Sequence, residues 1–229
     1  MLSNHRRTFL YSLLLLVLLI LLFVGVGRHP PEAAPETTFA PIGRLDDSTY
    51  RAMDDIRNVV LSGVARALNV IGGGWVTIPV RVVVSLWLAF RGRWRALGAW
   101  VLTWVAAEEL LTAAKAFFHR GRPPDPLVAI TGYSFPSGHA VAAAATAVAL
   151  VLVLMPPGPR RRKWEAIAVL FAFVMAFSRV YLNAHWLSDV VAGVVLGACV
   201  ALGSAALATE VRDVAMRMRG APVRAGAPP

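Results

Sequence analysis

The chain has 229 residues, of which 57% are hydrophobic and 16% are charged, and its formal net charge is +10. This composition is typical of a membrane protein, and the length leaves room for one bundle of spanning helices but not for a large soluble domain as well. Nucleic-acid binding is not indicated, because the basic residues fall in short clusters between apolar segments, which is the pattern that membrane topology produces.

An apolar segment over about residues 9–26 follows Arg6 and Arg7 and predicts an N-terminal transmembrane anchor over residues 1–27. A cleaved signal peptide is the alternative, since it also combines a charged start with an apolar core. The segment is longer than a typical signal core, so we expect an uncleaved span with its N-terminus in the cytoplasm.

Residues 28–74 are expected to lie on the outer face of the membrane. The first part is rich in proline and acidic residues and predicts an exposed loop. From about residue 49 to 71, charged side chains are mixed with Val, Leu and Ala, which predicts one amphipathic helix at the outer interface.

Residues 75–209 are predicted to form a helix bundle, and residues 210–229 a basic cytoplasmic tail. The bundle contains five further apolar segments, at about 75–90, 96–114, 139–155, 164–177 and 186–208. With the anchor they give an all-α, polytopic membrane helix bundle of about six transmembrane helices. Gly193 and Gly197 predict close helix packing inside this bundle. The one cysteine, Cys199, excludes an internal disulfide.

The arginine clusters predict which loops share a side of the membrane. Counted from a cytoplasmic N-terminus, the clusters at 91–95, at 160–163 and in the tail all face the cytoplasm, as the positive-inside bias requires. The polar stretches 115–137 and 178–189 then share the outer face.

The second of these polar stretches brings three functional side chains close together. His185 and Asp189 are four residues apart, so on a helix the carboxylate reaches one imidazole nitrogen and fixes the tautomer. Arg179 adds a permanently charged fork that suits phosphate oxygens. Read alone, the stretch is also consistent with a helix-capping aspartate and an arginine at the membrane surface.

The first polar stretch carries further cations and ends at a helix start. A Ser-Gly pair at the beginning of a span offers a hydroxyl and free backbone N–H groups, a common anion site. The groups able to surround a dianion are Lys115, Arg122, Ser137, Gly138 and Arg179. His139 and His185 can face each other across it. No acidic cluster suited to magnesium lies near, so we expect no metal and no other cofactor.

Three patterns run through these stretches in order: Lys-x6-Arg-Pro from Lys115, Pro-Ser-Gly-His from Pro136, and Ser-Arg-x5-His-x3-Asp from Ser178. Together they resemble the three motifs of the type 2 phosphatidic acid phosphatase (PAP2) superfamily, and every motif position matches. The resemblance covers residues 96–208 well and the first 74 residues hardly at all. It implies a metal-independent membrane phosphatase that works through a phosphohistidine.

The resemblance also implies a role for each matching residue. His185 is the expected nucleophile, Asp189 orients it, and His139 protonates the leaving oxygen. The residues expected to hold the phosphoryl oxygens are Lys115, Arg122, Ser137, Gly138 and Arg179. Spacing alone lets the two histidines exchange roles, although the aspartate four residues on favours His185. With ordinary histidine pKa values near ~6.5, a bell-shaped pH profile is expected.

A site at the outer end of a bundle suits a lipid whose tail stays in the bilayer. We expect a lipid phosphate or an isoprenoid diphosphate of the undecaprenyl type as substrate, in the plasma membrane, with no nucleic-acid partner and the oligomeric state undetermined. A phosphotransferase of the same family is the first alternative. A transporter or flippase that binds an anionic lipid without chemistry is the second.

Three other polar residues lie near the motifs. His119 and Arg120 are expected in a solvated loop, with contact to a lipid headgroup as the alternative. Glu108 lies seven residues before Lys115, and it either orients that lysine or packs against another polar group within the bundle.

Overall fold

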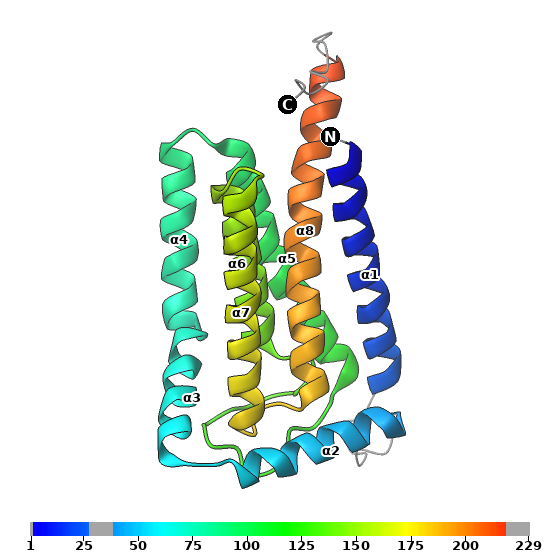
Figure 1. The fold of residues 1–229 in the computed structure, drawn as a ribbon, viewed down its shortest axis with the longest axis vertical. Helices are drawn as coiled ribbons and strands as arrows, with labels where there is room; N and C mark the ends of the chain where they lie inside the picture. Colours follow the sequence, from blue (N-terminus) through cyan, green and yellow to red (C-terminus); the bar gives the residue numbers. More distant parts are fainter. Residues whose placement is uncertain (1, 28–38, 219–229) are drawn as a thin grey trace.

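The computed structural model describes residues 2–27 and 39–218, and its account of side chains covers residues 14–27 and 39–211. Within these residues the chain is all-helical, as predicted. The helices are α1 (Leu2–Val26), α2 (Ala40–Asp55), α3 (Val59–Ile71), α4 (Gly74–Phe90), α5 (Trp94–Phe118), α6 (Gly138–Leu154), α7 (Pro159–Tyr181) and α8 (Leu187–Met218). Helices α1 and α4–α8 run along the long axis of the molecule, whereas α2 lies across one end (Figure 1).

The length and apolar character of these helices define a multi-pass membrane protein. By both measures α5, α7 and the Leu187–Val211 part of α8 can each cross a bilayer, and α3 with α4 can form a fourth span across a 43° bend. Leu14–Val26 and α6 are shorter apolar helices. Each apolar segment predicted from the sequence is therefore a helix of the bundle. Large apolar side chains such as Trp75 and Phe90 point outward, 92% and 88% exposed, as on a lipid-facing surface.

The predicted amphipathic helix over about 49–71 is in fact two helices, and the expectation of an exposed loop before it is wrong from Ala40 onward, where α2 begins. Helix α2 lies across the bundle end, but α3 turns away and continues toward α4 along the bundle (Figure 1). Asn58 causes the break, because its side-chain oxygen accepts a hydrogen bond from the N–H of Leu61 and caps α3. The Tyr181 hydroxyl bonds to both the N–H and the carbonyl of Asn58, which fastens this corner to α7.

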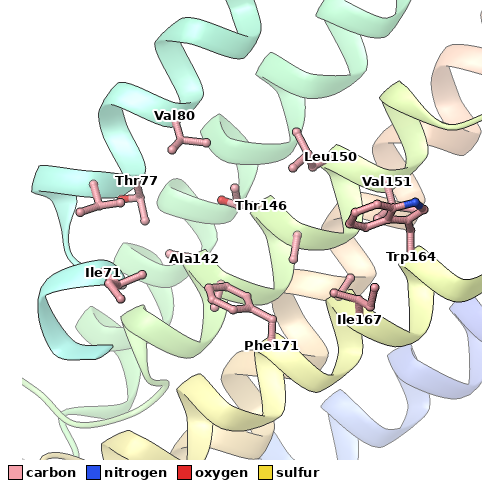
Figure 2. Close-up of a pocket in the computed structure, with 15 residues that line it drawn as sticks. Ile71, Thr77, Val80, Ala142, Thr146, Leu150, Val151, Trp164, Ile167 and Phe171 are labelled. Carbon is pink, nitrogen blue, oxygen red and sulfur yellow. The ribbon is translucent and has the colours of Figure 1, made fainter. Parts of the chain in front are cut away.

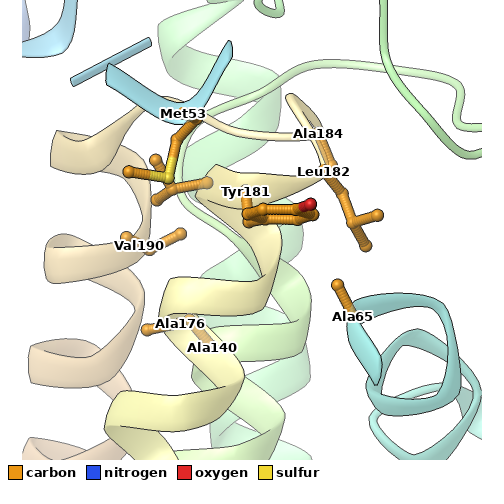
Figure 3. Close-up of a cluster of buried hydrophobic side chains, with 9 residues drawn as sticks. Met53, Ala65, Ala140, Ala176, Tyr181, Leu182, Ala184 and Val190 are labelled. Atoms are coloured by element: carbon orange, nitrogen blue, oxygen red, sulfur yellow. The ribbon is translucent and has the colours of Figure 1, made fainter. Parts of the chain in front are cut away.

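A buried cluster joins the N-terminal helices to the end of the bundle. Met53 of α2 and Ala65 of α3 pack with Ala140 of α6, residues 176–184 around the end of α7, and Val190 of α8 (Figure 3). On the other side Phe23 of α1 makes edge-to-face contacts with Phe118 and Phe135, at centroid distances of 4.9 and 5.4 Å. Segments distant in sequence thus hold the ends of α5–α8 together.

Helices α6 and α8 pack unusually close, as Gly193 and Gly197 predicted. A Cβ atom on Gly193 would lie 2.7 Å from the carbonyl oxygen of Ser137, and one on Gly197 would lie 2.5 Å from the carbonyl oxygen of Val141. Backbone atoms cannot move aside as side-chain ends can. Glycine is therefore required at both positions.

The arginine-rich connections lie at the end of the bundle opposite α2. These are the turn between α4 and α5 and the start of α7, and α8 also ends on that side (Figure 1). Helix α8 continues to Met218, so residues 210–218 of the predicted tail are helical. Residues 28–38 of the predicted outer loop, and residues 219–229 of the tail, lie outside the described residues.

Candidate active site

All the residues predicted to bind or transfer phosphate lie at the α2 end of the bundle. Lys115 lies in the last turn of α5 and Arg179 in the last turn of α7. Ser137 directly precedes α6, which places Gly138 and His139 in the first turn of that helix. The remaining three belong to the connecting loops and the start of α8: Arg122, His185 and Asp189.

The contacts of His185 define which of its nitrogens is free to react. Nη1 of Arg122 lies 3.2 Å from Nε2 of His185. Because a guanidinium can donate but cannot accept, Nε2 must carry the lone pair and Nδ1 the proton. Nδ1 faces Oδ2 of Asp189 at 3.5 Å, the long limit of a hydrogen bond. The carboxylate and the imidazole therefore face each other, although His185 lies in the bend before α8 and its Nδ1 has no hydrogen-bond partner among the described residues.

Burial keeps the His185 imidazole neutral. The side chain is 3% exposed. Burial lowers the pKa of His185 to about 4, an effect that Asp189 opposes. The charges of Arg122 and Arg179 also lower this pKa. His185 therefore keeps a free lone pair well below neutral pH. The sequence led us to expect an ordinary histidine pKa near ~6.5 instead.

Asp189 is completely buried and receives several hydrogen bonds. Its Oδ2 accepts bonds from the hydroxyl of Ser134 and from the N–H of Trp186, 2.9 Å away. Its Oδ1 accepts a 2.6 Å bond from Nη1 of Arg120. Breaking a buried ion pair of this kind by removing one partner typically costs about 3–5 kcal/mol.

The expectation of a solvated loop is wrong for Arg120. The residue is 5% exposed and pairs with two buried carboxylates, those of Asp189 and Asp46. Burial disfavours its charge, but the two carboxylates outweigh this effect and raise the pKa of Arg120 above its ordinary value. His119 is partly buried and packs edge-to-face on the Tyr133 ring at 4.6 Å. Sequence analysis also missed Asp46, which is 3% exposed.

Backbone carbonyl groups of the loop before α6 hold the two cations of the first motif. Nζ of Lys115 donates a hydrogen bond to the carbonyl of Tyr133. Arg122 donates to the carbonyls of Thr131, Gly132 and Tyr133, at 3.0, 2.8 and 3.1 Å. Both cations are therefore fixed by neutral acceptors, which leaves their positive charge available for an anion.

Ser137 presents an unused donor beside these cations. Its side chain does not cap α6, and its Oγ is buried without a hydrogen-bond partner among the described residues. An unpaired buried hydroxyl is costly unless a ligand engages it. A phosphoryl oxygen at the N-terminus of α6 would satisfy it.

Asn69 of α3 is a second residue that the sequence did not single out. Its backbone carbonyl lies 3.1 Å from Nε2 of His139, and its side-chain oxygen accepts a hydrogen bond from Nη1 of Arg179. Arg179 is 1% exposed, and its Nε has no partner among the described residues. The charges of Arg122 and Arg179 act on both His139 and His185, so the two imidazoles share one cationic site.

Among the described residues, Glu108 makes no hydrogen bond or ion pair with Lys115. It is exposed on α5, and its charge acts on Arg81 of α4.

An apolar cavity adjoins the site within the bundle. It has a volume of about 350 Å³ and lies between α4, α6 and α7, with the end of α3 at one edge (Figure 2). Its lining is apolar apart from the hydroxyl groups of Thr77 and Thr146 and the indole of Trp164. Gly72 lines this cavity, and a Cβ atom on Gly72 would lie 2.8 Å from Cδ2 of His139. The cavity therefore reaches the neighbourhood of the second histidine.

Comparison with known proteins gives a family match, a similar relative and two similar solved structures. Residues 97–213 match the PAP2 superfamily. Phosphatidylglycerophosphatase B of Bacillus subtilis (strain 168) is 30% identical over 159 residues, which are 66% of this chain and 77% of that protein. The crystal structure of a transmembrane PAP2-type phosphatidylglycerolphosphate phosphatase from Bacillus subtilis superposes with a TM-score of 0.73 at 23% identity, covering 89% of this chain and 96% of that one. That of Aquifex aeolicus LpxE superposes with a TM-score of 0.57 at 24% identity, covering 69% and 92%.

Proposed function

The chain belongs to the PAP2 superfamily, and we propose that it dephosphorylates a membrane lipid through a covalent phosphohistidine on His185. Membership makes it a membrane lipid phosphatase. The covalent intermediate, the residue roles and the choice of lipid are the parts that we propose.

One observation carries the proposal: the bonding of the buried, neutral His185. Its Nε2 lone pair points to Arg122, a phosphate-binding cation, while its Nδ1 faces the carboxylate of Asp189. A phosphoryl group drawn in by Arg122 would arrive directly in front of that lone pair. An anionic lipid carrier needs the cations, but it has no use for an oriented nucleophile.

The first chemical step forms a bond between Nε2 of His185 and phosphorus. The bond from phosphorus to the bridging oxygen breaks, and protonated His139 gives its proton to that oxygen. The lipid product leaves as an alcohol from a phosphomonoester, or as a lipid monophosphate from a diphosphate ester. Lys115, Arg122 and Arg179 stabilise the negative charge on the transferring group. Phosphorylation of Nε2 gives the His185 imidazole, which keeps its proton on Nδ1, a positive charge. The Asp189 carboxylate balances this charge.

The second step returns the enzyme to its starting state. His139, now neutral, takes a proton from water as the water oxygen attacks phosphorus. The bond between phosphorus and Nε2 breaks, which releases inorganic phosphate and restores the lone pair of His185. The balance is one water consumed and one inorganic phosphate formed, together with an alcohol from a phosphomonoester or a lipid monophosphate from a diphosphate ester.

The apolar cavity supports a lipid as the substrate. It lies along the bundle beside His139 and is lined by the side chains of spanning helices, so an alkyl chain can occupy it while the headgroup meets the cations. Ile71 and Gly72, at the end of α3, form part of its wall. We infer that α3 shapes the lateral entrance from the bilayer.

The headgroup is a phosphomonoester or a diphosphate ester. The similarity to phosphatidylglycerophosphatase B makes phosphatidylglycerophosphate the first candidate. Phosphatidic acid and undecaprenyl-type isoprenoid diphosphates present the same terminal phosphoryl group and remain in the proposal. We place the chain in the plasma membrane with the site on the outer face, because the arginine-rich connections lie at the opposite end.

The test is phosphate release by the purified full chain in detergent with EDTA, across a panel of these lipids. We expect turnover in EDTA by the wild-type chain and none by His185→Ala, which should still bind the lipid. Equal function in both proteins would favour the carrier. Transfer of the phosphoryl group to added glycerol in preference to water would identify a phosphotransferase.

The role of the cavity is tested separately. Ala147→Phe fills space among the residues that line it, whereas Val169→Phe adds the same ring on the outer surface of α7, where Val169 is 65% exposed. We expect Ala147→Phe to lower kcat/KM at least tenfold for a long-chain lipid phosphate but not for a water-soluble phosphate ester. Equal loss on both substrates would remove the cavity from the proposal.

A further inference from the structure

A continuous set of buried polar contacts connects the helix across the bundle end to the nucleophile. Arg120 donates from Nη1 to Oδ1 of Asp189 and from Nη2 to Oδ2 of Asp46, at 2.6 and 2.7 Å. Asp189 in turn faces His185. Asp46 belongs to α2, outside the segment that matches the family and 142 residues before Ser188, which it also contacts.

We propose that Asp46 and Arg120 are positioning residues that fix the orientation of the Asp189 carboxylate, and through it the His185 imidazole. The kinetic part of this inference rests on the proposed function. Neither residue is expected to touch the substrate, because both are buried and their described polar contacts lie within the protein.

The geometry explains why Asp189 needs an external constraint. A carboxylate can rotate about the bond that joins it to the side chain, and His185 needs one particular oxygen, Oδ2. Arg120 holds the other oxygen, Oδ1, so rotation would break a charge-assisted hydrogen bond. Arg120 therefore determines the direction of Oδ2 together with the Ser134 hydroxyl and the Trp186 N–H, which bind Oδ2 itself.

Asp46 fixes the orientation of the Arg120 guanidinium in the same way. Because one guanidinium nitrogen is bound to Asp189 and the other to Asp46, the plane of the fork is fixed at two points. The Arg120 guanidinium also lies over the Trp186 ring, 5.7 Å from its centroid. Removal of Asp46 would leave the guanidinium fixed at one end.

Asp46 also caps the helix that carries Asp189. Its Oδ1 accepts a hydrogen bond from the N–H of Ser188, and its Oδ2 accepts one from the Ser188 hydroxyl, at 2.8 and 2.6 Å. The first N–H groups of a helix have no partner within the helix, and a carboxylate is well suited to them. A side chain of α2 thus fixes both the cation beside Asp189 and the backbone just before it.

The first test compares Asp46→Asn with Asp47→Asn, a matched control at the neighbouring, exposed position on α2. Both are assayed as full chains in detergent on a water-soluble phosphate ester. We expect Asp46→Asn to lower kcat about tenfold or more with KM changed less than twofold, and Asp47→Asn to match the wild type. Wild-type kcat in a monodisperse Asp46→Asn protein would overturn the inference.

The second test uses the charge balance of the three residues. Arg120→Gln leaves two buried carboxylates without their cation, so we expect kcat to fall about a hundredfold or more. Adding Asp46→Asn removes one of these carboxylates and should raise kcat at least severalfold above that of Arg120→Gln alone. If the two substitutions caused unrelated structural defects, their losses of kcat would multiply, and the double variant would be slower than Arg120→Gln alone. That result would count against the inference.

A third measurement does not need turnover. Nitrogen-15 spectra of labelled histidine report the tautomer of each of the five histidines, with His185→Gln identifying the His185 signals. We expect a fixed Nδ1–H tautomer in the wild type and in Asp47→Asn, and a mixture in Asp46→Asn. Identical spectra in all three proteins would exclude positioning. Absence of phosphate release by the wild type, with this spectral difference present, would refute the proposed function alone.

Discussion

The backbone carbonyl of Asn69 lies 3.1 Å from Nε2 of His139, while the side-chain oxygen of the same residue accepts a hydrogen bond from Arg179. One residue of α3 thus contacts both the second histidine and a cation that we propose binds phosphate. A phosphoryl group that entered the site would compete with Asn69 for these donors.

We therefore expect the charge at position 69 to control substrate affinity. Asn69→Asp has nearly the same shape but adds a negative charge beside Arg179, which repels a phosphate dianion. Its KM should exceed that of Asn69→Ala by about tenfold, a difference of roughly 1.4 kcal/mol. Steady-state kinetics with a lipid phosphate measures both, and equal KM values would show that the phosphate does not reach Arg179.

A second prediction concerns the covalent intermediate. With a substrate whose leaving group needs no proton, such as a nitrophenyl phosphate, His139→Ala should still form the phosphohistidine but should hydrolyse it slowly. In the proposed mechanism the missing side chain is the base that activates water in the second step. Quenching with radiolabelled substrate should therefore trap more acid-labile label on His139→Ala than on the wild type. No label should appear on the double variant with His185→Ala.

The pH dependence follows from the burial of His185. Its pKa is lowered to about 4 in the folded protein, so the lone pair is lost only when the pH falls toward that value. We expect the acid limb of kcat/KM well below pH 6, and an acid limb near ~6.5 would contradict the burial of this imidazole. The unfolded chain binds this proton near ~6.5, so His185 also makes the fold less stable as the pH falls from there toward 4.

Close packing of α6 against α8 predicts a position-specific effect of one methyl group. A Cβ atom on Gly197 would meet backbone atoms of Val141 and Ala145 at 2.5 and 2.8 Å, whereas one on Gly203 would have no atom within 4 Å. Gly197→Ala should lower stability by roughly 1–3 kcal/mol. Gly203→Ala, in the same helix, should be neutral or stabilising. Thermal unfolding in detergent compares the two.

The sequence was sufficient for the helices of the bundle, because continuous apolar segments predict spans whose length the bilayer imposes. It also predicted that the three motifs share one end of the bundle. Glycine spacing predicted close packing of the last span inside the bundle, although it did not identify α6 as the partner. These features are encoded locally or in fixed order.

The roles of Arg120 and Asp46 could not be predicted from the sequence, because each residue acts through a contact distant in sequence. Arg120 stands in a polar, proline-containing stretch that looks solvated until α2 covers it. Asp46 did leave a signal: it lies seven residues before Met53, on the same face of α2 as this buried apolar side chain. A carboxylate on a buried helix face requires a hydrogen-bond or ion-pair partner, but the sequence alone does not show which residue that partner is.

The position of α2 also has a consequence for biosynthesis. Asp46 leaves the ribosome long before Ser188, its partner 142 residues later. Until α8 has been made, this carboxylate lacks its Ser188 partner. The contacts that hold Asp189 can therefore form only late in synthesis, after α1–α7 have already been made.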